Sequence, residues 1–543
     1  MQLIRYQHVP HEVLNQPPPL TGYNLFSTDR ALREGVAREG AGWACEELHE
    51  YGQKSGTAEA LDWGVAANQN PPVLHTHDRY GHRRDEVEFH PAWHNVMSLA
   101  VEHRIHSLPW SDSRPGAHVA RVALAMLASE MEAGHVCPVS MTYSAVPVLR
   151  RDPELAAEWE PRLLSKLYDP RLLPASEKTG ALMGMAMTEK QGGSDVRANT
   201  TRAEHLTGLE YALQGHKWFC SAPMCDAFLV LAQAPGGLSC FFLPRWTPDG
   251  KKNAFHIQRL KSKLGNRSNA SSEVEFDGAW ARRIGDEGRG VATIIEMVHH
   301  TRLDCVMGSA ALMRRALVEA VHHARHRHAF GKALIDQPAM QCVLADLALE
   351  SEAATLLLLR LARAFDEGDR PLARLGVAVG KFWVAKRTPV HVAEALECLG
   401  GNGYVEESAM PRLYREAPLN SIWEGSGNVI ALDVLRALAK DPGALDRMLA
   451  EIREARNSSV LKAAAEIEVD VRHNPGERDA RSIAERLALA LQASLMIRFS
   501  PPAMSDAFCA TRLDGKWGRT FGTLPASANV QGIIQRLDVI ETT

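Results

Sequence analysis

Apolar residues recur at helical spacing along two long stretches of the chain. Between about residues 90 and 180, Val119, Val122 and Met126 lie three and four positions apart, which places them on one face of a helix. From residue 291 onward longer apolar segments return, with the lengths that helix bundles use. We therefore predict two helical regions. The apolar segments of the second region run over residues 310–321, 343–365 and 377–399.

The period changes between about residues 181 and 281. Short apolar or alternating runs stand there between Gly, Pro and Asp residues. Such runs are typical of β-strands joined by turns, so we predict an antiparallel β domain inserted between the two helical regions. The runs cover residues 211–219, 228–232, 240–243 and 272–276.

The two ends of the chain add further parts. Gln16–Pro19 predicts an extended, polyproline-like arm that is ordered only where it lies on another part of the protein. Pro442–Gly443 breaks the chain, and Ile483, Leu487 and Leu491 then form one helical stripe. The predicted fold is mainly α with a central antiparallel β domain. Its parts are an N-terminal arm and helical domain (1–180), the β domain (181–286), a C-terminal helical bundle (287–440) and an added helical domain (441–543).

The charge balance and the cysteine content are typical of an intracellular protein, and they indicate no particular binding partner. The 61 Lys+Arg and 65 Asp+Glu residues give a formal net charge of −4, so no global attraction to nucleic acid or acidic membranes is expected. Nine Cys without a C-x-x-C pair indicate buried thiols in a reducing compartment. Met1–Pro10 has no signal-peptide core, and no stretch approaches 18 apolar residues. We therefore expect a cytoplasmic protein without a membrane partner.

Histidines cluster at two places along the chain and could bind a metal ion. His299 and His300 are adjacent, and His322 and His326 are four residues apart, with His323 and His328 beside them. Arginines are interleaved and no H-E-x-x-H pattern occurs, so a solvated helix face is the favoured interpretation and no metal site is predicted.

A glycine-containing loop at Met187–Val196 joins the first β segment to a polar stretch. Its adjacent glycines let backbone N–H groups approach an anion, and its Thr and Ser hydroxyls can donate, which would suit a pyrophosphate or a flavin carbonyl. By itself the loop is more often a plain turn. It lacks the spacing of a Walker loop and of a dinucleotide fingerprint.

Two further segments carry possible chemistry. Gly400–Tyr404 follows a helix and either brings backbone close to a phosphate or a neighbouring subunit, or simply ends the helix. Glu424 stands between Trp423 and Gly425 ahead of an apolar helix. Such neighbours would raise the pKa of its carboxyl group and suit it as a general base. The alternative is an acidic residue favoured by the helix dipole.

Five motifs occur in a fixed order on this helix–sheet–helix plan. They are T-E-x-x-x-G-S-D at Thr188–Asp195, G-x-K-x-x-x-S at Gly215–Ser221, R-x-x-F-G-K at Arg327–Lys332, G-G-x-G at Gly400–Gly403 and E-G-S at Glu424–Ser426. Together they closely resemble the acyl-CoA dehydrogenase flavoprotein family over roughly residues 100–440.

The resemblance implies FAD between the β domain and the C-terminal helices. Thr188 and Ser194 would hold the flavin ring and pyrophosphate, and Ser221 would lie near the reactive flavin nitrogen. Arg327 and Phe330 would reach the adenine end across a subunit boundary, which implies a homo-oligomer. The implied cofactor-binding residues are Met187, Thr188, Gly193, Ser194, Trp218, Phe219, Ser221, Arg327, Phe330, Gly400, Gly401, Trp423, Gly425, Ser426 and Asn428.

The same resemblance assigns the chemistry. Glu424 matches the base that removes the α-proton of an acyl thioester while hydride leaves for the flavin, and Thr301 occupies the base position of another branch. Glu397, Pro338 and Asn428 stand where the family pattern commonly has Gln, so an ordinary β-oxidation role is not expected.

The chain resembles most specifically the branch of the family that belongs to the adaptive response to DNA alkylation. That resemblance implies a homotetramer, weak acyl-CoA dehydrogenase activity and duplex-DNA binding through the last hundred residues. Residues 441–543, however, carry 13 Lys+Arg and 14 Asp+Glu, and the domain could instead pack on the bundle. We expect a DNA-associated flavoprotein, with an acyl-CoA dehydrogenase as the alternative. The best candidate DNA patch is Arg498, Arg512, Lys516 and Arg519.

Overall fold

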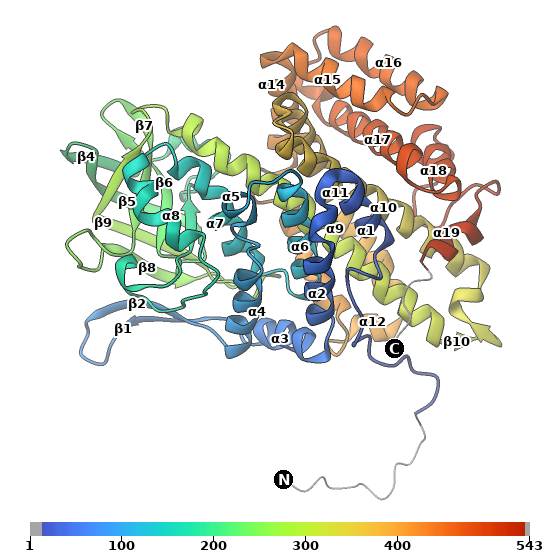
Figure 1. The fold of residues 1–543 in the computed structure, drawn as a ribbon, viewed down its shortest axis with the longest axis horizontal. Helices are drawn as coiled ribbons and strands as arrows, with labels where there is room; N and C mark the ends of the chain where they lie inside the picture. The colour runs from blue at the N-terminus through green and yellow to red at the C-terminus, as the bar shows by residue number, and fades with distance from the viewer. Residues whose placement is uncertain (1–12, 538–543) are drawn as a thin grey trace, which may run out of the picture.

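The computed structural model describes residues 13–537 and is mainly helical, with one β domain at one end of the molecule (Figure 1). The expectation for Met1–Pro10 lies outside the described residues. The predicted fold class, a largely helical protein with a β-sheet domain, is confirmed. Within residues 13–537, no helix combines the length and apolarity needed to cross a membrane.

The N-terminal region is an assembly of short helices. Polar residues define several of its helix starts: Asp29 accepts a hydrogen bond from the Leu32 amide, and Asp152 precedes Pro153, which stands at the first helical position. The bounds are α1 Arg30–Val36, α2 Cys45–Ser55, α3 Ala58–Gln69, α4 Pro91–Glu102, α5 Leu108–Ser111, α6 Ala117–Met131, α7 Val136–Leu149 and α8 Pro153–Leu163.

Helix α6 carries the apolar face predicted from residues 119–127, and the helix itself is confirmed. It is buried around its whole circumference, because it packs against α2, α9 and α10 together. The buried Arg121 side chain forms an ion pair with Asp304 of α9. The sequence pattern predicted one buried face for this helix, whereas nearly all of its side chains are buried.

A β-hairpin that the sequence pattern did not predict leaves the helical region and lies along the β domain (Figure 1). It consists of β1 (Val73–His77) and β2 (Arg83–Glu88). Asp85 accepts a hydrogen bond from the Ile257 amide at 2.9 Å. This contact joins the hairpin to strand β8.

The strands of the β domain form one seven-stranded sheet that closes on itself through the β6–β7 pairing. Most neighbours are antiparallel, as predicted, but β3 and β6 pair in parallel. A parallel pair needs a long crossover, and here residues 187–226 provide it. The bounds are β3 Met183–Ala186, β4 Arg202–Thr207, β5 Glu210–Ser221, β6 Ala227–Ala234, β7 Gly237–Pro244, β8 Phe255–Leu260 and β9 Ser271–Ile284.

Three long helices form the C-terminal bundle, and the candidate base Glu424 lies in the loop that precedes α14. Helix α11 packs against both α9 and α10, and the short β10–β11 hairpin (His328–Ala329 and Lys332–Ala333) connects α9 to α10. The bounds are α9 Gly290–His326, α10 Pro338–Asp366, α11 Arg370–Cys398, α12 Gly401–Tyr404, α13 Met410–Glu416 and α14 Gly427–Lys440.

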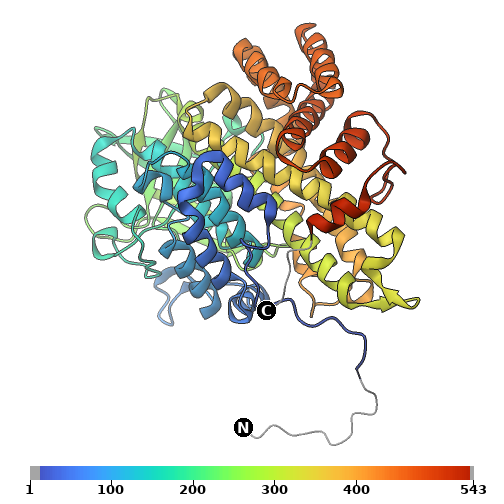
Figure 2. The ribbon, with the colours of Figure 1, turned by 45° about the vertical axis from the view of Figure 1, so that its right-hand side comes forward.

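The last helices pack directly on this bundle. Figure 2 shows them, in orange and red, against the yellow helices, and α17 contacts both α10 and α11. Ile483, Leu487 and Leu491 of α17 are buried, as the apolar stripe predicts. The bounds are α15 Pro442–Arg453, α16 Ser458–Arg472, α17 Ala480–Phe499, α18 Pro502–Phe508 and α19 Val530–Arg536.

The N-terminal arm lies on the rest of the chain, as its Pro-rich sequence required. Asn15 accepts a hydrogen bond from the His328 amide at 2.7 Å and donates to the His328 carbonyl at 2.8 Å. The Asn402 side chain donates to Gln16 at 2.8 Å. The arm therefore connects the β10–β11 hairpin to α12.

Candidate active site

Glu424 lies in the loop 422–428, and two buried cations hold the backbone of this loop. Lys381 of α11 donates to the carbonyls of the residues immediately before and after Glu424, both at 2.6 Å. The Arg302 Nε of α9 donates to the Glu424 carbonyl at 3.0 Å. Three successive carbonyls are thus held by charge-assisted hydrogen bonds, which are stronger than neutral ones. The loop is positioned by the bundle.

The backbone of this loop has an uncommon conformation. Glu424 has a φ of 58° and Gly425 a φ of 107°, both in the left-handed region. For a residue with a Cβ this conformation costs ~1–3 kcal/mol and persists only where the surroundings enforce it. The hydrogen bonds from Lys381 and Arg302 provide that enforcement. Strain held in this way is typical of functional sites.

The carboxyl group of Glu424 is withdrawn from solvent. Its Oε2 atom is buried and has no hydrogen-bond partner within residues 13–537. Burial raises the pKa of Glu424, and Lys381, the Thr301 hydroxyl and Arg302 act in the opposite direction. The raised pKa predicted from the neighbouring residues is confirmed. The Thr301 contact also places the two alternative base positions side by side.

The glycine-containing loop after β3 is attached to β5 by a buried ion pair. The Lys217 ammonium lies 2.8 Å from Glu189, and both side chains are fully buried. Although burial disfavours its charged form, Lys217 and hydrogen bonds from Thr201 and Thr200 lower the pKa of Glu189 to about 2. A Cβ added at Gly193 would lie 2.4 Å from the Thr188 hydroxyl, so only glycine fits this turn.

Strand β5 brings the aromatic part of the predicted site to the same loop. The Trp218 amide donates to the Thr188 carbonyl at 2.8 Å. Phe219 is 53% exposed although it is a large apolar side chain beside a polar loop. Ser221 follows two positions later, beyond an irregularity in the β5–β9 pairing between Lys217 and Cys220. The Thr188 loop therefore lies against the end of β5 that carries Phe219 and Ser221, and together they form one surface.

Three residues that sequence reasoning did not assign join this surface to Glu424. Charges on Lys263 and Glu424 act on the buried Cys137 thiol of α7, which also contacts Asn269 and Ser221. Burial raises the pKa of Cys137 to about 12 and lowers that of Lys263 to about 8. The segment 263–271 is distinctive in the sequence, but its spacing did not indicate this contact.

The residues present fit a flavin. Two buried acceptor atoms, Oε2 of Glu424 and Oδ1 of Asn269, have no hydrogen-bond partner in the described chain. Buried polar atoms in native proteins are normally paired, so each of these two acceptors can take a hydrogen bond from a bound group. The exposed Phe219 ring offers an apolar face, and Ser221 offers a hydroxyl. Such a surface suits a planar ring system with polar edges.

The remaining predicted cofactor residues lie elsewhere in the chain. Phe330 is 98% exposed at the tip of the β10–β11 hairpin, at the opposite end of the molecule from the β domain (Figure 1). Arg327 donates to the Asn15 carbonyl at 2.6 Å. A Cβ at Gly400 or Gly401 would meet open space. One chain alone therefore does not bring these residues to Thr188 and Ser221.

The residues that flank Glu424 are partly or fully exposed, and one of them contacts the added C-terminal helices. Trp423 donates from its indole N–H to Asn420 at 3.0 Å, and Ser426 is exposed. Asn428, also exposed, accepts a hydrogen bond from Arg481 at 2.9 Å. Arg481 belongs to the added C-terminal helices, so these helices contact the base-carrying loop.

The structure corrects the proposed DNA patch. Arg512 is buried, and its guanidinium pairs with Asp346 at 2.6 Å and Glu350 at 3.0 Å on α10. Arg498 pairs with Glu451 at 2.8 Å. These arginines neutralise carboxylates at the contact between the last helices and the rest of the molecule, which the sequence could not show. The exposed cations of the patch are Lys516 and Arg519.

Thiols and histidines do not assemble into a metal centre in the part of the chain that the structure describes. No group of three His, Cys, Asp or Glu side chains is placed to hold a metal ion there. All nine cysteines are free thiols.

Comparisons with known proteins place most of the chain in one family. Residues 15–170 match "Adaptive response protein AidB N-terminal domain", residues 184–279 match "Acyl-CoA dehydrogenase, middle domain", and residues 288–439 match "Acyl-CoA dehydrogenase, C-terminal domain". The solved structure of Caenorhabditis elegans ACDH-11 in complex with C11-CoA superposes with a TM-score of 0.83 at 26% identity, covering 99% of this chain and 95% of that one. The chain belongs to the acyl-CoA dehydrogenase family, whose cofactor is FAD.

Within this family the similarity extends along nearly the whole chain to one relative. The putative acyl-CoA dehydrogenase AidB of Escherichia coli K12 is 49% identical over 516 residues, covering 94% of this chain and 95% of that protein. The structure of Bd2924 in its apo form has a TM-score of 0.82 at 30% identity, covering 89% of this chain and 99% of that one. The chain is therefore a homologue of AidB.

Proposed function

We propose that this protein is an FAD-dependent oxidoreductase that removes the α-proton of an acyl thioester with Glu424 as the base. The observation that carries the proposal is the buried Oε2 atom of Glu424, which has no hydrogen-bond partner in residues 13–537 and lies on a loop held by two buried cations. A carboxyl group with a raised pKa and a free acceptor atom can take up a proton from carbon.

The residues of this chain would divide the work as follows. Lys381 and Arg302 hold the loop, so that the Glu424 carboxylate is in place before a thioester binds. Oε2 takes the α-proton, and the neutral acid that results suits the buried surroundings. FAD, when bound, supplies the hydride acceptor for the β-hydrogen. Thr188, Phe219 and Ser221 offer the surface for the flavin ring.

The separation of the predicted cofactor residues supports a homo-oligomer. The β10–β11 hairpin, which carries Phe330 at its tip and follows Arg327, lies at the opposite end of the molecule from the β domain (Figure 1), so a second copy would have to supply these residues. We propose a homotetramer, the state that the sequence resemblance implies. Light scattering of the full chain tests it. Phe330→Asp would weaken assembly and FAD retention together if the hairpin completes the partner's site, and a monomeric wild-type protein that retains FAD would contradict it.

Anaerobic flavin bleaching tests the dehydrogenase proposal. The FAD-loaded protein would be mixed with a panel of acyl-CoA esters of increasing chain length, and loss of flavin absorbance would be followed. Bleaching by at least one ester supports the proposal. C. elegans ACDH-11 was solved with C11-CoA, so medium-chain esters belong in the panel. If no ester bleached the flavin, the proposal that the protein dehydrogenates acyl thioesters would be refuted.

We also propose that the protein associates with duplex DNA in the response to alkylation damage. The similarity to AidB over 94% of the chain supports this second proposal, together with the match of residues 15–170 to an adaptive-response protein. The exposed Lys516 and Arg519 are the candidate phosphate contacts. The buried Arg512 is not among them.

Fluorescence anisotropy with a labelled duplex at several salt concentrations tests the DNA proposal. Truncation after Lys440 is a poor variant, because α17 shares its core with α10 and α11. Lys516→Glu with Arg519→Glu in the full chain keeps the fold and reverses two charges. Binding that falls steeply with salt and is weakened by this double variant supports the proposal. Absence of binding at low salt would refute it.

We further propose a cytoplasmic location. Nine free thiols, most of them buried, suit a reducing compartment, where disulfides are rare. Fractionation of cells with an antibody against the full chain tests this placement.

A further inference from the structure

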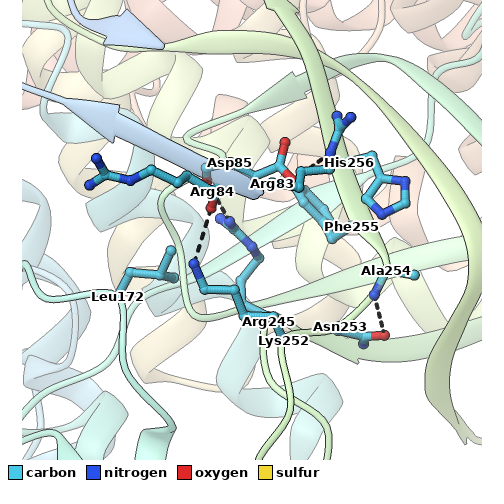
Figure 3. A pocket seen from close by; sticks show the side chains of 10 residues that line it. All are labelled: Arg83, Arg84, Asp85, Leu172, Arg245, Lys252, Asn253, Ala254, Phe255 and His256. Carbon is cyan, nitrogen blue, oxygen red and sulfur yellow. Dashed lines mark hydrogen bonds and ion pairs between the residues drawn. The ribbon is translucent and has the colours of Figure 1, made fainter. Parts of the chain in front are cut away.

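A separate cavity lies between the β1–β2 hairpin and the β domain. Its volume is about 250 Å³, and Figure 3 shows side chains from both parts around it, with Leu172 at one side. The hairpin contributes Arg83 and Arg84, and the connection between β7 and β8 contributes Arg245 and Lys252. None of its lining residues belongs to the set predicted to hold FAD.

The cavity lining is strongly cationic. Four cationic side chains line it, with Asp85 as the only carboxylate in the lining, and Asp85 already accepts from Arg83 at 2.7 Å. Glu86, outside the lining, pairs with Arg84 and lies 3.5 Å from Lys252. Positive charge remains in excess even when this outer carboxylate is counted.

Arg245 is the most deeply buried of the four cations, and the charges nearest to it are those of Asp85 and Asp226. The residue is 5% exposed, and its guanidinium donates to two backbone carbonyls, those of Asp85 at 2.7 Å and of Pro223. Within the described part of the chain, no carboxylate forms an ion pair with it. A buried charge is costly unless a counter-charge compensates it. An anion in the cavity would supply that counter-charge.

Lys252 reaches the cavity from the connection between β7 and β8, on the side of the cavity that faces the hairpin. Its ammonium donates to the Arg84 carbonyl at 3.2 Å and pairs with Glu86 at 3.5 Å, so one of its three donors remains for a ligand among the described residues. Arg83 donates through one terminal nitrogen to the Ile257 carbonyl at 3.1 Å and through Nε to Asp85. Its other terminal nitrogen remains for a ligand. The cavity therefore offers several donors and few acceptors.

We propose that this cavity is a binding site for a small phosphate-bearing anion, such as a diphosphate or a phosphomonoester. Guanidinium groups match phosphate oxygens in charge and in planar geometry, and a lysine adds a point charge. The volume suits a small ligand, near the lower end of ordinary ligand sites. Phe255 is buried to 1% exposure, so the cavity has no large open apolar wall that would favour a neutral ligand.

Such an anion would also connect two parts of the fold. Arg83 and Arg84 belong to the hairpin, and Arg245 and Lys252 belong to the β domain, so one ligand would contact both. A ligand that binds only the folded protein raises its melting temperature in proportion to the logarithm of its concentration. Binding would therefore be visible as a thermal shift that saturates.

Calorimetric titration of the FAD-saturated full chain tests the site. The probes are pyrophosphate, inorganic phosphate and ADP, with chloride at equal ionic strength as the reference. We expect saturable binding of at least one phosphate probe with no change in the flavin spectrum. Tighter binding of ADP than of pyrophosphate would identify an organic ester, and the reverse a simple phosphate. The unchanged flavin spectrum distinguishes this site from the cofactor site.

Two partly exposed cations provide the test variants, because Arg245 holds the fold. Lys252→Gln and Arg83→Gln should each weaken binding at least tenfold, and the thermal shift should shrink with it. Lys251→Gln is the matched control, since Lys251 is the exposed neighbour that pairs with Asp249 and does not line the cavity. Absence of saturable binding of every probe at 10 mM would overturn the proposal. Equal weakening by the control would do the same, since it would reveal a general charge effect.

Discussion

Replacing Glu424 with Gln removes the proposed base while keeping the size of the side chain. The buried Oε2 atom has no hydrogen-bond partner among the described residues, so the substitution breaks few contacts within the protein. A positioned general base contributes ~10²–10⁴-fold to a rate, which corresponds to roughly 2.7–5.5 kcal/mol of barrier. We therefore expect flavin bleaching by a reactive acyl-CoA to slow by at least ~10²-fold in the Glu424→Gln variant.

The same substitution should stabilise the fold at neutral and alkaline pH. Burial raises the folded-state pKa of Glu424, so folding favours its protonated form. This favourable contribution is fully present below the unfolded pKa and is lost as the pH rises through the raised folded pKa. Gln carries no charge at any pH and escapes this loss. We therefore expect the melting temperature of the variant to exceed that of the wild type increasingly with pH.

Stopped-flow bleaching at several pH values measures the rate, and Glu130→Gln provides the control. Glu130 is also a buried carboxyl group, with its pKa raised by burial to about 8, but its charged neighbours are Arg314, Arg315 and Asp29 rather than the active site. The wild-type rate should rise as the pH passes the raised pKa of Glu424. Bleaching by the Glu424 variant at the wild-type rate, or an equal loss in the Glu130 variant, would refute the assignment.

Three further outcomes follow from buried charges. Arg512→Met leaves the buried Asp346 without its ion-pair partner, while Glu350 keeps Arg387, and should destabilise the protein by ~3–5 kcal/mol in urea unfolding. Lys516→Gln on the nearby surface should stay within ~0.5 kcal/mol of wild type. Although burial opposes it, three arginines lower the pKa of Glu451 to about 2. Its stabilising contribution is present above the ordinary carboxyl pKa and should be lost as the pH falls toward 2, measured by acid unfolding of wild type against Glu451→Gln. Lys381→Met frees the carbonyls on either side of Glu424 and should lower both the melting temperature and the bleaching rate.

The helical and β regions of this protein were predictable because their periods differ locally. Apolar residues three and four apart predicted helix α6, and short apolar or alternating runs predicted β5, β6, β7 and β9 of the sheet. The β1–β2 hairpin was not predicted, because the sequence R-R-D-E-V-E of β2 has little apolar alternation. That hairpin is held by hydrogen bonds that Asp85 accepts from the Ile257 amide of β8 and from the Arg245 guanidinium, which a hydrophobic pattern cannot reveal.

The candidate base could also be predicted from sequence, since Glu424 and its flanking residues form one contiguous motif. Its environment could not. Lys381, Arg302 and Thr301 come from two other helices and meet the Glu424 loop only after the bundle has packed. Cys137 approaches the same site from a helix almost 300 residues earlier in the sequence.

The sequence by itself determined the helix–sheet–helix order and the family, and it singled out Glu424 as the candidate base, since these depend on local periods and contiguous motifs. Only the tertiary structure decided which charged side chains are paired and buried and which remain available to bind a ligand. Arg512 belongs to a basic-looking segment but neutralises buried carboxylates, whereas Arg245 is buried without a carboxylate partner. The physical reason is that a charge acquires its partner and its solvent exposure through packing of segments far apart in the chain, which spacing along the sequence does not encode.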